Sequence, residues 1–197
     1  MTRRTAGTIE VHGHAVTDLT PRQASDLGIA WVPEDRHEAG LVAPMTVSAN
    51  LSLSWLRGSS RFGLVPRDAE RELVTQLIAR LRVRPPQPGR RAAQLSGGNQ
   101  QKVVIGKALA TQPRILLLDE PTRGVDVGAK AEIHGLISEL KQRGAAVLMV
   151  SSELPEALNV ADRLVVLHEG RTVAVRDRGA TEDEVMTDAF GRGAAAA

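Results

Sequence analysis

The chain has 197 residues, 42% of them hydrophobic, and a formal net charge of +2, which fits one globular domain or one and a half. It contains no cysteine, so a disulfide framework and a thiolate metal site are excluded. Its longest apolar runs, such as 145–150, are far shorter than the ~20 residues that span a bilayer, and no apolar stretch follows Arg3 and Arg4. We therefore expect a cytoplasmic protein that does not insert into a membrane and meets one only through a partner.

Hydrophobic alternation and helix-capping residues predict the elements of the first half of the chain. In order, we expect a strand at 8–11, a helix from Thr20 to Gly28, a strand at 29–32, a loop at 33–46, a helix from Thr46 to Leu56 and a helix at 66–82. Thr20 and Thr46 are N-cap residue types, and Pro21 suits a first helical turn. Prolines and a glycine at 85–89 then break the pattern.

Beyond that break, predicted strands alternate with predicted helices. In order, we expect a helix from Ser96 to about Thr111, a strand at 114–118, a helix at 127–143, a strand at 145–150, a short helix at 155–160, strands at 164–167 and 172–175, and a helix at 182–190. This alternation predicts an α/β fold with a parallel sheet, into which residues 47–95 are inserted as a helical region.

Five arginines lie between Arg80 and Arg91, and a nucleic-acid-binding patch is one interpretation of them. Proteins that bind nucleic acid usually combine a broad basic face with aromatic side chains that stack on bases. Aromatic residues make up only 2% of this chain, and tyrosine is absent. We favour a solvated linker broken by prolines and expect no nucleic acid partner.

The segment 95–102, Leu-Ser-Gly-Gly-Asn-Gln-Gln-Lys, places two glycines after a serine at the start of a predicted helix. Backbone N–H groups at a helix N-terminus lack partners within the helix, and the helix dipole adds partial positive charge there. With the Ser96 hydroxyl as a further donor, the segment is a candidate phosphate-binding site. An ordinary glycine-containing N-cap is the alternative, and the segment alone does not decide between the two.

A second candidate site follows the apolar run Ile115–Leu118, which ends in the carboxylates of Asp119 and Glu120. A buried strand has no need of acids at its tip unless something pairs with them. Asp119 can hold Mg²⁺ or its water, and Glu120 can orient or deprotonate an attacking water. An acidic turn is the weaker alternative, because these acids follow a glycine-opened helix.

Together the two segments resemble the ATP-binding-cassette (ABC) ATPase family. LSGGNQQK is similar to the signature motif, ILLLDEP to the Walker B strand, and Gly124-Val125-Asp126 to the D-loop, which contacts the other subunit. The segments VPEDR at 32–36, PTRGVDVGAK at 121–130 and VSSELP at 150–155 resemble the second cassette of ribose- and galactose-type sugar importers. The likeness covers residues 8–171.

The resemblance implies an α/β, P-loop NTPase-like (RecA-like) parallel sheet with a helical ABC insert, incomplete at the N-terminus. We expect a partial ABC ATPase domain over 1–193 and a frayed tail at 194–197. Its expected parts are a strand pair, helix and Q-loop region at 8–46, a helical subdomain at 47–95, a core with the signature helix, Walker B, D-loop and H-loop at 96–180, and a C-terminal helix at 181–193.

By the same resemblance, ATP and Mg²⁺ are the expected cofactors. The implied nucleotide-contacting residues are Leu95, Ser96, Gly97, Gly98, Gln100, Glu34 and Asp126, the implied metal ligands are Asp119 and Glu34, and the implied catalytic residues are Glu120 and Ser152. Glu34 stands where most members have the Q-loop glutamine, and Ser152 stands where most have a histidine. Serine cannot become cationic, and loss of one such stabilising group can lower a rate ~10²–10³-fold, so the resemblance implies a degenerate site.

No G-x-x-x-x-G-K-[ST] loop occurs in the sequence, although the resembled family has this Walker A motif before its first strand pair. Loss of three charge-assisted hydrogen bonds, each worth about 1.5–3 kcal/mol, would lower affinity by roughly three to six decades. We therefore expect the chain alone to bind ATP poorly and to hydrolyse it negligibly. We also expect the strand at 115–118 to present an unpaired apolar edge, where the Walker A strand would otherwise lie.

These observations lead to two functional hypotheses. In the first, the chain is the energy-coupling ATPase module of a sugar importer on the inner face of the cell membrane, with a second ABC cassette and a transmembrane permease as partners. Its signature motif would then serve an ATP held by the partner cassette, and residues 34–56 would line the groove for the permease. In the second, it is a non-catalytic remnant or assembly module. An ABC ATPase acting on DNA or ribosomes is disfavoured, because the sequence shows neither a long coiled coil nor a basic arm.

Overall fold

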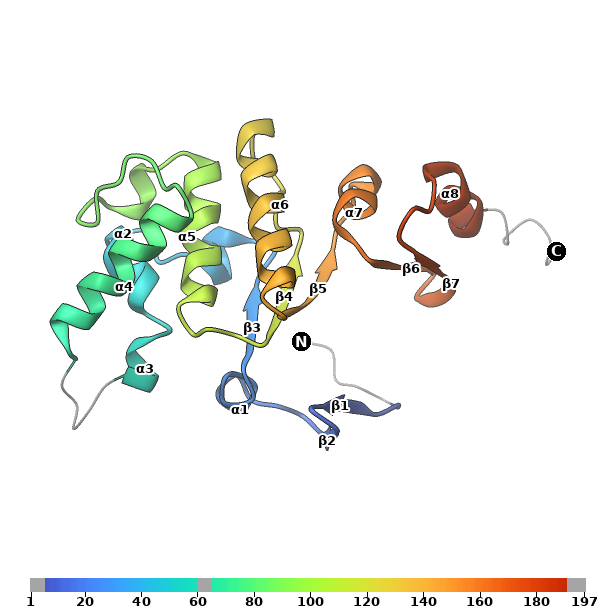
Figure 1. The fold of residues 1–197 in the computed structure, drawn as a ribbon, viewed down its shortest axis with the longest axis horizontal. Helices are drawn as coiled ribbons and strands as arrows, with labels where there is room; N and C mark the ends of the chain where they lie inside the picture. Colours follow the sequence, from blue (N-terminus) through green and yellow to red (C-terminus); the bar gives the residue numbers. More distant parts are fainter. Residues whose placement is uncertain (1–5, 60–64, 191–197) are drawn as a thin grey trace. The chain divides into compact units, whose positions relative to one another are not determined.

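The computed structural model describes residues 6–59 and 65–190, which Figure 1 shows as a ribbon. The chain divides into two compact units, residues 1–148 and 149–197. The expected tail at 194–197 lies outside the described residues.

The first unit begins with a short hairpin and a capped helix. Strands β1 (Ile9–Val11) and β2 (His14–Val16) pair antiparallel. β1 corresponds to the expected strand at 8–11, whereas the hydrophobic pattern did not predict β2. Helix α1 (Pro21–Asp26) follows. The Thr20 side chain accepts from the Gln23 backbone N–H, and the Gln23 side chain accepts from the Thr20 backbone N–H, so the predicted N-cap is confirmed as a capping box.

A three-stranded sheet in the order β3-β4-β5 follows from β3 (Ile29–Val32), β4 (Ile115–Asp119) and β5 (Ala146–Val150). β3 and β4 run parallel, with Ile29 opposite Ile115 and Val32 opposite Leu118. The expected unpaired edge at 115–118 is wrong, because β4 is the central strand with a hydrogen-bonded neighbour on each side. The chain itself supplies both neighbours, so the edges of this sheet are β3 and β5.

The helical region has more breaks than the sequence predicted. Its elements are α2 (Val47–Ser52), α3 (Leu56–Ser59), α4 (Arg67–Arg80) and the 3₁₀ turn η2 (Ala92–Gln94). Thr46 caps α2 as expected, accepting from the Ala49 N–H at 3.1 Å. The single helix expected from Thr46 to Leu56 is wrong, because a turn in which Trp55 N–H donates to the Ser52 carbonyl separates α2 from α3.

The segment 33–46, expected to be loop throughout, contains one turn of π-helix, η1 (Arg36–Gly40). Asp35 caps this turn, and its carboxylate accepts from the backbone N–H groups of His37 at 2.7 Å and Glu38 at 3.2 Å. At the other end, the Lys107 ammonium donates to the Gly40 carbonyl. Both ends of η1 are thus fixed by side chains, which the local sequence pattern does not reveal.

Helix α5 (Gly97–Leu109) is the buried centre of the first unit and contacts α2, η1, η2, β3 and α6 (Val127–Gln142). Val103, Val104 and Ile105 are at most 2% exposed. The helix can approach its neighbours closely because position 106 is glycine: a Cβ there would lie 2.5 Å from Leu51 Cδ2 and from Leu81 Cδ1. α5 therefore packs directly against the helical region.

The second unit consists of α7 (Leu154–Val160), the antiparallel hairpin β6 (Arg163–His168) and β7 (Arg171–Asp177), and α8 (Glu182–Phe190). Both strands extend beyond their predicted bounds. Arg176 on β7 forms a two-pronged ion pair with Asp188 on α8, at 2.7 and 3.0 Å. This pairing raises the pKa of Arg176 above its ordinary value and ties the hairpin to the helix.

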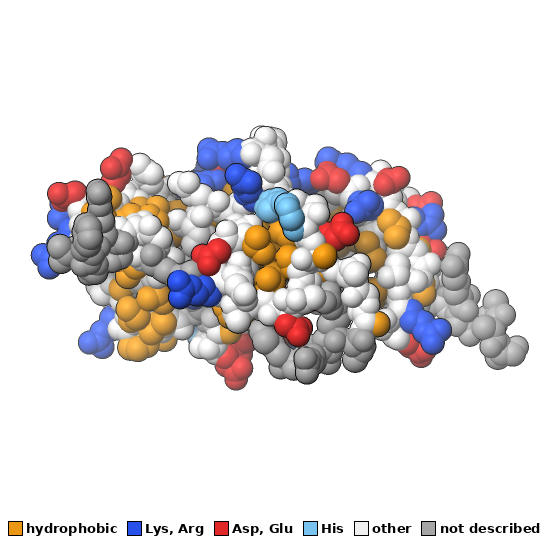
Figure 2. Space-filling view, turned by 90° about the horizontal axis from the view of Figure 1, so that it is seen from below, with side chains coloured by type: hydrophobic (Ala, Val, Ile, Leu, Met, Phe, Trp, Pro, Cys, Tyr) orange, Lys and Arg blue, Asp and Glu red, His pale blue; other side chains and the backbone are white. Residues whose placement is uncertain are grey.

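The surface of the described residues carries charges of both signs. On the face in Figure 2, Lys and Arg side chains are interspersed with Asp and Glu side chains. Within residues 6–59 and 65–190, no helix is both long enough and apolar enough to cross a bilayer.

The two interior helix glycines at 106 and 135 give a matched test of this packing. Gly106→Ala gains helix propensity but must displace Leu51 and Leu81, so we expect a net loss of about 1–2 kcal/mol of unfolding free energy. The Cβ of Gly135→Ala on α6 meets nothing within 4 Å, so this variant should gain up to about 1 kcal/mol. Urea denaturation measures both, and equal effects of the two substitutions would contradict the packing described here.

Candidate functional site

The N-terminal tip of α5 presents hydrogen-bond donors that the fold leaves unused. Ser96 is the N-cap residue, yet its side chain accepts no capping hydrogen bond from the helix backbone. Among the described residues, the backbone N–H groups of Gly97, Gly98 and Asn99 have no acceptor. Three donors at the positive end of a helix dipole suit an anion.

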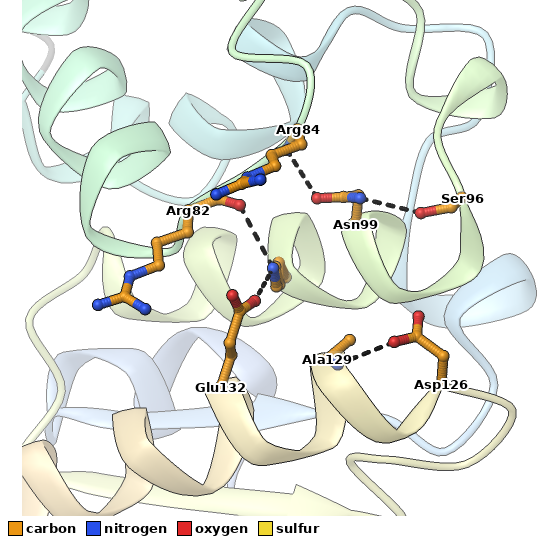
Figure 3. A network of polar contacts seen from close by, with 8 residues as sticks. Arg82, Arg84, Ser96, Asn99, Asp126, Ala129 and Glu132 are labelled. Atoms are coloured by element: carbon orange, nitrogen blue, oxygen red, sulfur yellow. Dashed lines mark hydrogen bonds and ion pairs between the residues drawn. The ribbon is translucent and has the colours of Figure 1, made fainter.

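The Ser96 hydroxyl is oriented by a short relay, shown in Figure 3. The Asn99 side-chain amide donates to Ser96 Oγ at 2.9 Å, and the Asn99 side-chain oxygen accepts from the Arg84 backbone N–H at 2.7 Å. Because Ser96 Oγ accepts in this arrangement, its own proton is left for another acceptor. The relay also links the tip of α5 to the segment that follows α4.

Lys102, about one turn beyond Asn99 on α5, also holds this helix in place. The Lys102 ammonium donates to the Arg82 carbonyl at 3.3 Å and forms an ion pair with Glu132 on α6. The Lys102 side chain is only 7% exposed, and a buried cation needs such partners. The N-terminal part of α5 is therefore held by the segment that follows α4 and by α6.

The two signature glycines allow the tip of α5 to lie directly against the predicted D-loop. A Cβ at Gly98 would lie 2.8 Å from Ala129 Cβ and 3.1 Å from Asp126 Oδ2, and a Cβ at Gly97 would lie 3.3 Å from the Gly124 carbonyl oxygen. Asp126 caps α6 by accepting from the Ala129 N–H at 2.9 Å. Of the predicted site residues, the structure thus brings together Ser96, Gly97, Gly98 and Asp126.

Two further predicted nucleotide contacts, Leu95 and Gln100, are buried at 7% exposure each. Gln100 uses both ends of its side-chain amide within the fold: its oxygen accepts from Arg36 Nε at 3.4 Å, and its nitrogen donates to the Ala92 carbonyl at 3.4 Å. Leu95 follows the turn η2 as its C-cap residue. Both side chains therefore support the tip of α5 from inside the protein.

The acidic residues lie at the carboxyl edge of the sheet. Asp119 ends β4 and Glu120 follows it, both half-buried. Glu34 follows β3, the parallel neighbour of β4, and therefore reaches the same edge. Glu120 has a φ of +46°, a left-handed conformation that costs a non-glycine residue about 1–3 kcal/mol and often marks a functional site.

The fit of a magnesium ion at this edge is partial. The Glu34 carboxylate forms an ion pair with the Arg123 guanidinium, which competes with a metal for the same oxygens. In the part of the chain that the structure describes, no three His, Cys, Asp or Glu side chains gather closely enough to hold a metal by themselves. Mg²⁺ at Asp119 would therefore depend on phosphate and water oxygens, a mode of binding usual for this ion.

Ser152 belongs to the second unit, where it lies two residues beyond β5 and is exposed. Its neighbour Ser151 contacts the segment that starts α7: Ser151 Oγ accepts from the N–H of the N-cap residue Glu153 at 3.1 Å and donates to Glu156 at 2.5 Å. The role predicted for Ser152 stays a prediction.

The sequence reasoning missed Arg36 as a site residue. Its Nε donates to Gln100 and its Nη1 donates to the Arg123 carbonyl at 3.2 Å, so one side chain connects η1, α5 and the turn after β4. An arginine in a segment expected to be loop carries no periodic signal. Only the contact between distant segments reveals it.

The cap of η1 gives a pH-dependent prediction. The backbone N–H groups of His37 and then Glu38 hold the pKa of Asp35 below its ordinary value of 3.8. The carboxylate therefore stabilises the folded chain above that value, and this contribution is lost as the pH falls through the lower folded-state pKa. We expect Asp35→Ala to lower the urea midpoint at about pH 6 and to differ less from the unsubstituted chain at about pH 3. A difference equally large at both pH values would contradict this role.

Comparison with known proteins gives the site a context. A family model described as ABC transporter matches residues 1–123. The chain is 51% identical over 191 residues to the ribose import ATP-binding protein RbsA 2 of Streptomyces avermitilis, covering 96% of this chain and 38% of that protein. It is 50% identical over 186 residues to a putative ribose/galactose/methyl galactoside import ATP-binding protein 3 of Agrobacterium fabrum, covering 94% and 37%. The chain thus spans less than two fifths of these relatives.

Solved structures share the fold. MJ1267 in its ADP conformation, an ATP-binding cassette of an ABC transporter, gives a TM-score of 0.74 at 25% identity over 94% of this chain and 74% of that one. A dimeric post-hydrolysis state of the ATP-binding cassette MJ0796, bound to ADP and Pi, gives 0.76 at 23% identity over 91% and 77%. The second likeness concerns the fold alone. The predicted P-loop NTPase-like fold is confirmed.

Proposed function

The chain belongs to the ABC transporter family, and we propose that it forms part of the ATP-binding subunit of a sugar importer. The relatives named above are import ATP-binding proteins for ribose or for ribose, galactose and methyl galactoside. Because the chain spans 38% of the first of them, the import activity, the sugar and the partners are inferred from likeness. A second ABC cassette and a permease are the partners proposed, with the chain held at the inner face of the membrane through the permease.

The observation that carries the proposal is the tip of α5. It offers the N–H groups of Gly97 and Gly98 and the hydroxyl proton of Ser96, none of which has an acceptor among the described residues. Such donors suit the terminal phosphate of ATP bound by the partner cassette. Asp126 and the rest of the D-loop, which lie against this tip, would face the same partner.

The carboxyl edge of the sheet would form the chain's own half-site. Asp119 would hold Mg²⁺, which neutralises charge on phosphate oxygens, and Glu120 would orient the attacking water. Glu34 would complete this half-site from the Q-loop, and Ser152 is proposed to occupy the H-loop position of the family. Within the proposed domain, residues 8–46 would carry the Q-loop, residues 47–95 the helical subdomain, residues 96–180 the core and residues 181–193 the C-terminal helix.

A narrower function is favoured by the ion pair between Glu34 and Arg123. A carboxylate engaged by a guanidinium is a poorer metal ligand, and serine at position 152 cannot carry the positive charge of a protonated histidine. In this form of the proposal, the chain supplies only its signature tip and D-loop, and the half-site at Asp119 turns over slowly or not at all.

A chimeric protein would test the proposal. We would replace the 191 matching residues of the Streptomyces avermitilis relative with this chain, then measure ATP hydrolysis and ribose uptake in cells that lack the original protein. The chimera should support both. Ser96→Ala should lower hydrolysis about 10²-fold or more, since it removes a donor to the reacting phosphate.

Ser138→Ala, an exposed serine on α6, is the matched control and should leave hydrolysis unchanged. Glu120→Gln separates the two forms of the proposal: a large loss favours a working half-site at Asp119, and a change of less than about twofold favours the narrower function. The proposal would be refuted by a chimera that takes up no ribose, or by one whose rate of ATP hydrolysis does not change with Ser96→Ala.

A further inference from the structure

The guanidinium of Arg36 lies at the tip of α5, although Arg36 belongs to η1. Its Nη2 is 3.0 Å from the position that a Cβ of Gly97 would occupy, and its Nη1 is 3.7 Å from the corresponding position at Gly124. Glycine at both positions leaves room for the guanidinium. The Arg36 guanidinium therefore lies beside Gly97, the first residue of α5.

The hydrogen-bond partners of Arg36 are neutral, and the exposed carboxylate of the preceding residue, Asp35, attracts the guanidinium without forming an ion pair with it. Nε donates to the Gln100 side-chain oxygen and Nη1 to the Arg123 carbonyl, both of them neutral acceptors. In the described part of the chain, no carboxylate forms an ion pair with Arg36, and Nη2 has no acceptor. The nearby Asp126 uses its carboxylate to cap α6.

A cation in this place is unfavourable by itself. The N-terminus of α5 carries the positive end of the helix dipole, which repels a guanidinium by a few tenths of a kcal/mol to about 1 kcal/mol. Arg36 is also half-buried, which removes part of its hydration. A neutral hydrogen-bond donor would be enough to hold α5 and the turn after β4 together. An anion bound at the tip would offset both the repulsion by the helix dipole and the loss of hydration.

We propose that Arg36 is a further phosphate ligand at the tip of α5. Its Nη2 donates to the terminal phosphate of a nucleoside triphosphate held by the partner cassette, beside the Ser96 hydroxyl and the Gly97 N–H. The fork of donors on a guanidinium matches phosphate oxygens better than an ammonium does. This inference rests on the proposed function, since it deepens the description of the same half-site.

Inorganic tripolyphosphate is a suitable probe, because it carries the terminal phosphate without the base or sugar. We would titrate it into the purified chain at low salt and follow the backbone amide signals of Gly97 and Gly98 by NMR. Both signals should shift in the unsubstituted chain. Arg36→Gln should weaken binding at least about tenfold, the effect expected for loss of one charge-assisted hydrogen bond.

Two variants make this result specific. Arg71→Gln on α4 removes an exposed arginine that pairs with Asp68, so it matches the change in net charge and should bind within about twofold of the unsubstituted chain. Arg36→Lys keeps the charge but not the fork, so it should bind with intermediate affinity. If Arg36→Gln does not fold, Arg36→Lys against Arg71→Gln decides the matter in the same way.

The outcomes separate this inference from the function on which it rests. If Ser96→Ala weakens tripolyphosphate binding and slows the chimera while Arg36→Gln does neither, Arg36 is only a brace and the proposed function stands. If no amide at the tip shifts in the unsubstituted chain and the chimera is inactive, both proposals fail together. Loss of binding and of chimera hydrolysis in Arg36→Gln, with Arg71→Gln unaffected, supports the inference.

Discussion

The close approach of helix α5 to its neighbours is the constraint on which the first unit depends. At Gly98 the helix lies so near to Ala129 that a Cβ would come within 2.8 Å, and at Gly106 it lies as close to Leu51 and Leu81. A helix packed this tightly cannot move its N-terminus freely. The donors at that end are therefore held in place before any ligand arrives, which is the condition under which such donors stabilise developing charge best.

Local signals in the sequence were sufficient to predict most helices and strands, and to predict where α5 begins. Capping residues such as Thr20 and Thr46 act within a few residues, so their effect is visible in the sequence. The lateral order of strands is not a local property, and the expectation of an unpaired β4 failed because neighbours in the sheet come from distant segments. The role of Arg36 could not be predicted for the same reason, since its partner Arg123 lies 87 residues away along the chain.

The two candidate half-sites differ in their electrostatics. The tip of α5 combines a helix N-terminus, a serine proton and the Arg36 guanidinium, all of which favour an anion. The carboxyl edge of the sheet gathers acids, which favour a cation, but the Glu34 carboxylate also forms a solvent-exposed ion pair with Arg123. A donor-rich helix tip together with an acidic edge whose Glu34 is ion-paired agrees with the proposal that the chain serves a nucleotide held by a partner cassette.

The segment from Glu120 to Asp126 connects these two regions. It leaves β4 through a residue in a left-handed conformation, turns through hydrogen bonds from Arg123 N–H to Glu120 and from Val125 N–H to Thr122, and then lies against Gly97 and Gly98. Arg36 holds this turn by its main chain and α5 by a side chain. Because one arginine bonds to both, a displacement of the turn after β4 must either carry the tip of α5 with it or break those bonds. These two hydrogen bonds therefore connect the turn that follows the acidic residues to the N-terminal part of α5.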